Sequence, residues 1–238
     1  QIMPWLEFRR VLFRSSHFMN LDYDKIFLFD RNYEDNFENE KIKYFHSKDL
    51  SVEINAIDAM NKISVDNNVE LFLISTIGGY DGGKYFWEED IETNKMMEIN
   101  FKTNFNLLKH FALKIKESNS GSAIFISALS GIYPTEKSLL YSTSKAALNS
   151  LIKAAAIDGR EINLTVNGIA PSILDTPSNR EMLSIEEIGQ LINLNVIADL
   201  IATVFKNKNM FNGNILELKS KWKKTNQFVY GEVNENMA

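Results

Sequence analysis

The stretch "SAIFISALSGIYPTEKSLLYSTSKAALNSL", residues 122–151, joins a short apolar run to a long Ala-rich segment through a turn rich in small hydroxyl residues. The apolar run 122–127 is typical of a strand buried inside a parallel sheet, because both of its faces are covered. The segment 141–158 contains neither Gly nor Pro, so we expect it to be helical throughout. Strand followed by helix predicts one unit of a parallel α/β sheet.

The same alternation continues on both sides of this stretch. Apolar runs predict further strands at residues 25–30, 42–46, 69–75, 164–170 and 214–218, and longer amphipathic stretches predict helices at 51–64, 91–117 and 185–207. No linker, repeat or low-complexity block divides the chain. We therefore expect one domain over residues 16–219, followed by a C-terminal tail at 220–238.

Composition excludes several functional classes. The chain has 238 residues and a formal net charge of -5, which argues against a nucleic-acid partner because neutralising phosphates needs a surplus of cations. The absence of cysteine excludes disulfides, thiolate metal sites and a catalytic thiol, and fits a cytoplasmic protein. The three histidines have no ligand-like spacing, so we expect no metal. No apolar run approaches the roughly 18 to 20 residues that span a bilayer, so we expect no membrane partner.

Tyr and Lys four residues apart occur four times, as Tyr44/Lys48, Tyr80/Lys84, Tyr133/Lys137 and Tyr141/Lys145. Two such side chains cooperate only where local structure brings them together, and on a helix this spacing places them on one face, roughly 6 Å apart. The first pair begins in a strand, the second spans a glycine-rich loop and the third contains Pro134. Only Tyr141/Lys145 opens a predicted helix. An ammonium one turn away favours a phenolate, so we expect Lys145 to lower the pKa of Tyr141.

Ligands of open parallel sheets bind outside the carboxyl ends of the strands, so functional residues should follow each apolar run. Asp30 closes the run "FLFD". Its carboxylate could accept hydrogen bonds from a ribose 2′-OH and repel a 2′-phosphate, or it could simply be a surface or helix-capping Asp.

Together these features resemble the short-chain dehydrogenase/reductase family from about Asp24 to Leu218. The motif "YSTSK" matches the family's Tyr-x-x-x-Lys, "MEIN" places Asn100 at the Asn of its proton relay, and "APSILDT" matches its Pro-Gly loop, with Ser172 in place of the Gly. The resemblance implies an α/β fold of the Rossmann type, a doubly wound parallel sheet with helices on both faces. Within the family, "GGYDGG" and "LDTPSNR" look most like the branch that includes dihydropteridine reductase.

The resemblance also implies a function. We expect an NAD-dependent oxidoreductase, using NAD rather than NADP, that transfers hydride between the nicotinamide and a small carbonyl or alcohol. It implies a small-molecule substrate and a homodimer or homotetramer. The implied catalytic residues are Tyr141, Lys145, Asn100 and Ser127. The implied cofactor-binding residues are Asp30, Asp49, Leu50, Gly78, Gly79, Tyr141, Lys145, Pro171 and Thr176.

The sequence departs from the family at the catalytic Ser. Thirteen residues before Tyr141, a common spacing to that Ser, stands Ala128, with Ser127 and Ser130 nearby. Either Ser127 serves after a shift of one residue, or the protein works without this Ser, as in the dihydropteridine reductase branch. We favour the second reading. Ala128, with "STIG" at 75–78 in place of Asn-Asn-Ala-Gly, also supports a rival hypothesis, a non-catalytic nucleotide-binding or interaction protein on the same fold.

The first residues depart further. Residues 6–15, "LEFRRVLFRS", resemble one reading frame of a common sequencing-adapter oligonucleotide, so we predict that residues 1–15 are not native. The first glycine is Gly78. The family's first strand and the Gly-rich turn that holds pyrophosphate at a helix N-terminus are then expected to be missing or degraded. The chain as written should lack a central strand and bind dinucleotide poorly.

Overall fold

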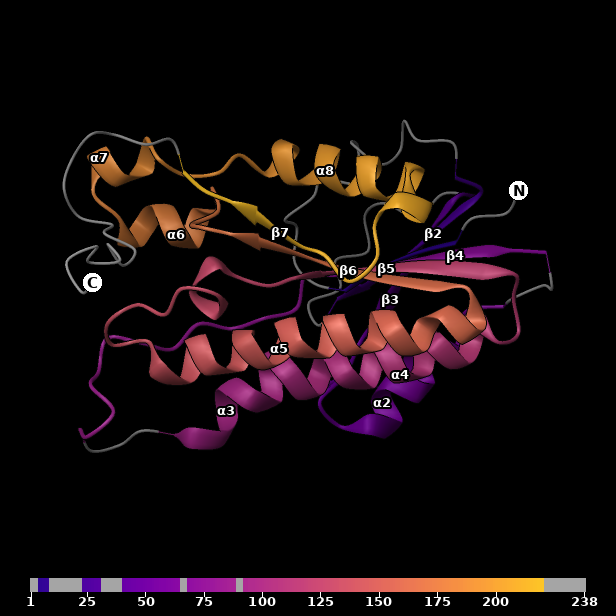
Figure 1. The fold of residues 1–238 in the computed structure, drawn as a ribbon, viewed down its shortest axis with the longest axis horizontal. Helices are drawn as coiled ribbons and strands as arrows, with labels where there is room; N and C mark the ends of the chain where they lie inside the picture. Colours follow the sequence, from indigo (N-terminus) through magenta and orange to yellow (C-terminus); the bar gives the residue numbers. More distant parts are fainter. Residues whose placement is uncertain (1–3, 9–22, 31–39, 65–67, 89–91, 221–238) are drawn as a thin grey trace, which may run out of the picture.

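The computed structural model describes residues 4–8, 23–30, 40–64, 68–88 and 92–220. Within these residues, seven strands form one parallel sheet in the order β3-β2-β1-β4-β5-β6-β7 (Figure 1). This is the order of a doubly wound sheet, whose direction of winding reverses beside β1. The strands are β1 (Pro4–Phe8), β2 (Lys25–Asp30), β3 (Ile42–His46), β4 (Glu70–Ser75), β5 (Ser120–Ile126), β6 (Leu164–Pro171) and β7 (Ile215–Leu218). The predicted fold class is confirmed.

Six of these strands coincide with the apolar runs of the sequence, with ends that differ by at most two residues. Strand β5 begins at Ser120, earlier than the run that predicted it, because Glu70 of β4 pairs with Ser120 in the parallel ladder. Pairing with a neighbouring strand therefore extends the strand into polar residues that carry no hydrophobic signal of their own.

The prediction that the central strand is missing is wrong. Strand β1 lies in the segment that we predicted to be non-native, and it pairs with β2 on one side and β4 on the other. Without β1, the facing backbone groups of β2 and β4 would lack partners, and buried unpaired amides are costly. The short sequence "PWLEF" is rich in apolar and aromatic residues, which suits a strand. The predicted loss of the Gly-rich turn concerns residues 9–22, which lie outside the described residues, as does the tail at 221–238.

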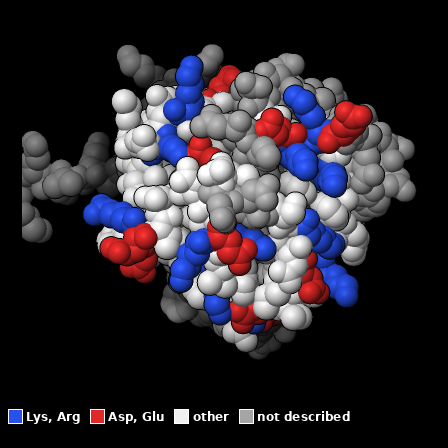
Figure 2. All heavy atoms as spheres, turned by 90° about the vertical axis from the view of Figure 1, so that its right-hand side faces the viewer, with Lys and Arg blue, Asp and Glu red and all other residues white. Residues whose placement is uncertain are grey.

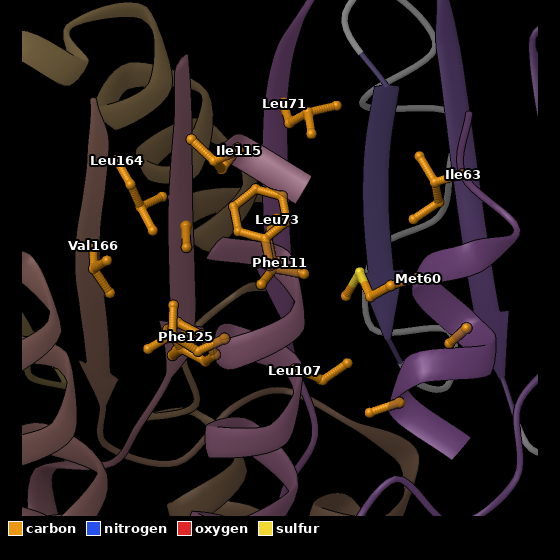
Figure 3. Close-up of a cluster of buried hydrophobic side chains, with 14 of the residues drawn as sticks. Met60, Ile63, Leu71, Leu73, Leu107, Phe111, Ile115, Phe125, Leu164 and Val166 are labelled. Atoms are coloured by element: carbon orange, nitrogen blue, oxygen red, sulfur yellow. The ribbon is translucent and has the colours of Figure 1, made fainter. Parts of the chain in front are cut away.

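Helices cover both faces of the sheet (Figure 1). One face carries α2 (Glu53–Asn61), α4 (Thr103–Ile115) and α5 (Leu139–Asp158), and the other carries α8 (Leu194–Lys206). Figure 3 shows part of the first hydrophobic core, in which Phe111 of α4 packs among side chains of the sheet. Ile197 and Ile201 of α8 are fully buried in the second core. The two cores hold the sheet between two helical layers, as expected for this fold class.

Two helical predictions need correction. The stretch 185–207 forms α7 (Ile185–Ile188) and α8 instead of one helix, because Ser184 caps α7 with a capping box and Asn193 caps a new helix after the break. The stretch 91–117 forms α3 (Thr93–Met97), a π-helical turn η1 (Glu98–Lys102) and then α4. A short helix α6 (Pro177–Met182), with Thr176 as its N-cap, was not predicted.

Three short 3-10 turns complete the described chain: η2 (Leu129–Gly131), η3 (Gly159–Ile162) and η4 (Lys208–Met210). On the face of the molecule drawn in Figure 2, positive and negative side chains are interspersed. The described residues of that face therefore form no single-sign surface of the kind that binds nucleic acid. Among the described residues, no helix is both long enough and apolar enough to cross a membrane.

Candidate active site

Three of the predicted catalytic residues come together at the carboxyl ends of β4 and β5. Tyr141 and Lys145 lie in the first turns of α5, and Asn100 lies in the π-helical turn η1 that precedes α4. Asn100 is fully buried and Lys145 is 4% exposed. π-Helical turns are rare and frequently occur at functional sites. Gly78, which follows β4, lies next to the side chains of both Lys145 and Asn100.

Lys145 is held between the end of β5 and the turn after β4. Its Nζ donates a hydrogen bond to the carbonyl oxygen of Ile126 at 3.1 Å. A Cβ added to Gly78 would lie 2.9 Å from the same Nζ. The missing side chain of Gly78 therefore leaves the space that the ammonium fills. This close approach explains why a glycine stands at this position.

The phenol of Tyr141 is strongly shifted. Burial raises the pKa of Tyr141 to about 12, a hydrogen bond from the Ser130 side chain lowers it, and the nearby Tyr80 raises it. The Lys145 Nζ lies 6.0 Å from the centroid of the Tyr141 ring. The net direction is opposite to the sequence-based expectation, because removing the phenolate from water outweighs the favourable hydrogen bond.

Tyr80 forms one side of the site. Its ring meets that of Tyr141 edge to face, with centroids 4.9 Å apart and an angle of 75° between the ring planes. Tyr80 is 64% exposed, so it forms an aromatic rim between the Tyr141 phenol and solvent. Sequence reasoning missed this residue, because the Tyr80/Lys84 spacing points to no helix and the ring reaches Tyr141 only through the fold.

Asn100 fastens the loop after β4 to α5. Its Oδ1 accepts from the backbone N–H of Gly79 at 2.9 Å, and its Nδ2 donates to the carbonyl oxygen of Gly79 at 3.0 Å. The same Nδ2 donates to Ser144 Oγ at 2.9 Å, and Ser144 in turn donates to the backbone carbonyl of Tyr141 at 2.7 Å. Asn100 thus sets the distance between the glycine turn and the helix that carries Tyr141.

Two hydroxyl residues, Ser127 and Ser130, lie on either side of Ala128 in the chain. Ser127 is buried, and its Oγ donates at 3.5 Å to the backbone carbonyl of Lys145. Ala128, at the position where the family has its Ser, is 6% exposed and carries no polar side chain. Ser130 lowers the pKa of Tyr141, whereas the Ser127 hydroxyl bonds to the backbone of the helix that carries Tyr141.

The predicted cofactor residues lie along the same edge of the sheet. Asp30 ends β2, and its backbone carbonyl accepts from Ser47 N at 2.8 Å. Pro171 ends β6, and Thr176 caps α6 through its hydroxyl, which accepts from Asn179 N at 3.2 Å. At this edge, β2 therefore ends in a carboxylate side chain, and β6 leads into a loop that ends at Thr176, the N-cap of α6.

Asp49 and Leu50 follow β3, where a residue that the sequence did not single out fixes the backbone of Leu50 and Ser51. Asn106 of α4 donates from Nδ2 to the carbonyl oxygens of Leu50 at 2.9 Å and Ser51 at 3.0 Å. Asp49 Oδ1 accepts from Ser51 N at 3.0 Å. No local motif marks Asn106, because its partners lie more than fifty residues away in the chain. In the part of the chain that the structure describes, no group of three or more His, Cys, Asp or Glu is placed to hold a metal ion.

Comparison with solved structures gives the same fold. The protein ElxO, solved with NADP bound, superposes with a TM-score of 0.78 at 19% identity, covering 92% of this chain and 97% of that one. A short-chain type dehydrogenase/reductase from Mycobacterium ulcerans superposes with a TM-score of 0.75 at 14% identity, covering 93% of this chain and 92% of that one. At these identities the similarity establishes the architecture alone.

Sequence comparison identifies the family. A curated relative, 2,5-dichloro-2,5-cyclohexadiene-1,4-diol dehydrogenase LinX of Sphingobium indicum, is 38% identical over 93 residues, which are 39% of this chain and 37% of the relative. The match thus spans little more than a third of that relative's length. The sequence model of the family described as short chain dehydrogenase matches residues 49–187, more than half of the chain and the whole of the Tyr141/Lys145 region. The chain therefore belongs to the short chain dehydrogenase family.

Proposed function

We propose that the protein is an oxidoreductase that transfers hydride between a nicotinamide dinucleotide and a small carbonyl or alcohol, with Tyr141 as the proton donor and acceptor. The observation that carries this proposal is the meeting of Tyr141, Lys145 and Asn100 at the carboxyl ends of β4 and β5. This is the edge of an open parallel sheet at which ligands bind.

The described residues fit a dinucleotide along this edge. Asp30 offers a carboxylate for a ribose hydroxyl, and Asn106 fixes the backbone of Leu50 in the loop after the neighbouring strand β3. Pro171 and Thr176 would meet the nicotinamide end. When bound, the cofactor would supply the hydride.

The proton transfer follows from the state of Tyr141. Burial raises its pKa to about 12, so the phenol is protonated at neutral pH and can donate its proton to a carbonyl oxygen. The phenolate that remains takes a new proton from solvent. Alcohol oxidation needs the reverse order and the ionised phenol. We therefore infer that carbonyl reduction dominates near pH 7 and that oxidation improves at high pH.

The cofactor preference is a separate proposal. Asp30 at the end of β2 supports NAD over NADP, because a carboxylate repels a 2′-phosphate. Two of the similar structures, both of ElxO, hold NADP or NADPH, so the likeness to solved structures does not support this preference. The proposed preference for NAD therefore rests on Asp30 alone.

We also propose a homodimer or homotetramer formed through α4 and α5 and a cytoplasmic location. Large apolar side chains are exposed on both helices, among them Phe105 and Leu113 on α4 and Leu139 and Ile157 on α5. Exposed apolar side chains on neighbouring helices suit an interface between subunits. Sedimentation of the chain at micromolar concentration tests the proposed oligomer, and a monomer would contradict it.

We further propose that residues 16–219 form one domain, to which strand β1 also belongs.

The rival function is a nucleotide-binding protein without turnover, which Ala128 favours because the usual hydroxyl is absent there. A panel of candidate substrates distinguishes this rival from the proposed oxidoreductase. Aldehydes, ketones and quinonoid dihydropterins are offered with NADH or NADPH, and open-chain and cyclic alcohols with NAD or NADP, while nicotinamide absorbance is followed. We expect turnover of at least one compound and its loss in Lys145→Met. Binding of NADH by calorimetry without turnover of any compound would instead support the rival.

A further inference from the structure

Resting on the proposed function, we infer that Asn104 is a positioning residue for the reaction, because its side chain joins the end of β4 to the helical turn that carries Asn100. Asn104 lies on α4, one turn after Asn100, and is 1% exposed. Ser75, the last residue of β4, is fully buried. Buried polar side chains are costly unless they are hydrogen-bonded, so the partners of these two residues indicate their role.

The Asn104 amide uses both of its polar atoms. Its Oδ1 accepts a hydrogen bond from Ser75 Oγ. Its Nδ2 donates to the backbone carbonyl oxygen of Asn100 at 2.8 Å and, at 3.4 Å, to that of Ile77 in the loop after β4. One side chain of α4 therefore links a strand end, the loop that follows it and the backbone of Asn100. The stretch "STIG" begins at Ser75, so its departure from Asn-Asn-Ala-Gly does not leave the end of β4 without a contact to α4.

The bond to the Asn100 carbonyl oxygen supports an irregular part of the helix. In η1 the backbone N–H of Thr103 donates to the carbonyl oxygen of Glu98, five residues back, whereas an α-helix uses the carbonyl four residues back. Thr103 Oγ1 donates to the same Glu98 oxygen at 2.9 Å. Asn104 adds a second bond from a side chain, to Asn100. The backbone position of Asn100 therefore depends on side chains as well as on helical hydrogen bonds.

A displacement of Asn100 would reach the reacting groups, because its side chain bonds to two parts of the site. It holds Gly79 through both the backbone N–H and the carbonyl oxygen. It also donates to Ser144, whose hydroxyl bonds to the backbone carbonyl of Tyr141. A misplacement of about 1 Å can slow a reaction by about a hundredfold. Asn104 therefore acts on the reaction through Asn100.

The first test compares Asn104→Val with Asn104→Thr, because the two new side chains have nearly the same shape and differ in one hydroxyl. A threonine hydroxyl on a helix can donate to the carbonyl oxygen four residues back, as Thr203 of α8 does to Asp199 at 2.8 Å. We expect single-turnover reduction of the best carbonyl compound of the panel to slow by about tenfold or more in Asn104→Val. In Asn104→Thr, the restored bond to the Asn100 carbonyl oxygen should recover most of this loss.

Asn167→Val is the matched control for the loss of a buried amide. Asn167 of β6 is fully buried, and its side chain bonds to the backbone of Phe211 and Asn214, which precede β7. Its replacement should lower the midpoint of urea unfolding, as Asn104→Val does, but leave the single-turnover rate of the folded protein unchanged. A control that slows the reaction as much as Asn104→Val would overturn the positioning role.

The same pair of variants in an Asn100→Ala background shows whether Asn104 acts through Asn100. A residue that works through another has no further effect once the other side chain is removed. We therefore expect Asn104→Val and Asn104→Thr to react at equal rates in this background. A difference between them that persists there would contradict the inference.

Amide hydrogen exchange gives a readout that does not depend on turnover. The N–H of Gly79 donates to Asn100 Oδ1, so its exchange should become faster by about tenfold or more in Asn104→Val and return toward the parent's rate in Asn104→Thr. An Asn104→Val protein that reduces the panel compound at the parent's rate overturns the inference, whatever its exchange. Faster exchange at Gly79 in a protein whose parent turns over no panel compound overturns the proposed function and, with it, the role of Asn104 in the reaction.

Discussion

An added Cβ at Gly78 would lie 2.9 Å from Nζ of Lys145, so the backbone of one residue limits the position of the other's ammonium. The same Cβ would lie 3.0 Å from Asn100 Oδ1. Both neighbours are buried polar groups with hydrogen bonds of their own. The geometry of the site therefore depends on a residue that carries no side chain.

Gly78→Ala should disturb the site. Because the methyl group must displace the Lys145 ammonium or the Asn100 amide, we expect kcat/KM for carbonyl reduction to fall by about tenfold or more. Gly189→Ala is the control, because its Cβ would meet only the Glu186 carbonyl oxygen at 3.4 Å, an ordinary contact. A Gly78→Ala enzyme with the parent's kcat/KM would show that the ammonium position is not critical.

Asp30→Ala should change the cofactor preference. Removing the carboxylate removes an acceptor for the ribose hydroxyl and a charge that repels a 2′-phosphate, so the ratio of NADH to NADPH affinity should fall by about tenfold. Dissociation constants from calorimetry measure the ratio. Asp58→Ala, which removes an exposed carboxylate from α2, should leave it unchanged. The assignment of Asp30 is wrong if both variants keep the parent's ratio.

Asn106→Ala should affect binding and stability together. It removes the donor shared by the carbonyl oxygens of Leu50 and Ser51. Leaving these buried groups unpaired should lower the free energy of unfolding by about 1 to 3 kcal/mol. The KM for the dinucleotide should rise with little change in kcat, because the loop does not touch the reacting atoms. Asn195→Ala, an exposed amide on α8, is the control. A lower kcat with an unchanged KM would argue against this role.

The pKa of Tyr141 predicts a pH dependence of stability. The pKa is raised in the folded protein from 10.0 to about 12. The folded state therefore holds this proton more tightly than the unfolded state, and this contribution to stability is fully present below pH 10 and is lost as the pH rises toward 12. In Tyr141→Phe this part of the decline should be absent. Urea unfolding at pH 9 and pH 11 measures it, and an equal decline in both proteins would contradict the pKa shift.

Much of the fold could be predicted because buried parallel strands leave a strong local signal. The runs at 25–30 and 42–46 became β2 and β3 with the same ends. Strand β1 was missed because its residues were set aside as non-native, while its place is fixed by pairing with β2 and β4. The break between α7 and α8 was missed because apolar periodicity continues across it, and only the caps at Ser184 and Asn193 mark it.

The site was predicted in part for a similar reason. Tyr141 and Lys145 share one helix, so their spacing alone indicates that they meet. The contacts of Tyr80 and Asn106 cross the fold, and they depend on how a loop and a helix pack together. The direction of the Tyr141 pKa shift was missed because burial of a phenol is a property of the packed structure, which local spacing does not report.

The central claim is that Tyr141 transfers the proton, and Tyr141→Phe tests it most directly. Calorimetry with NADH and single-turnover kinetics with the best carbonyl compound of the panel are measured on the parent and the variant. The account predicts a dissociation constant for NADH within about twofold of the parent and a chemical step slowed by about a hundredfold or more, since only the phenolic oxygen is lost. A variant that reduces the same compound at the parent's rate would contradict it.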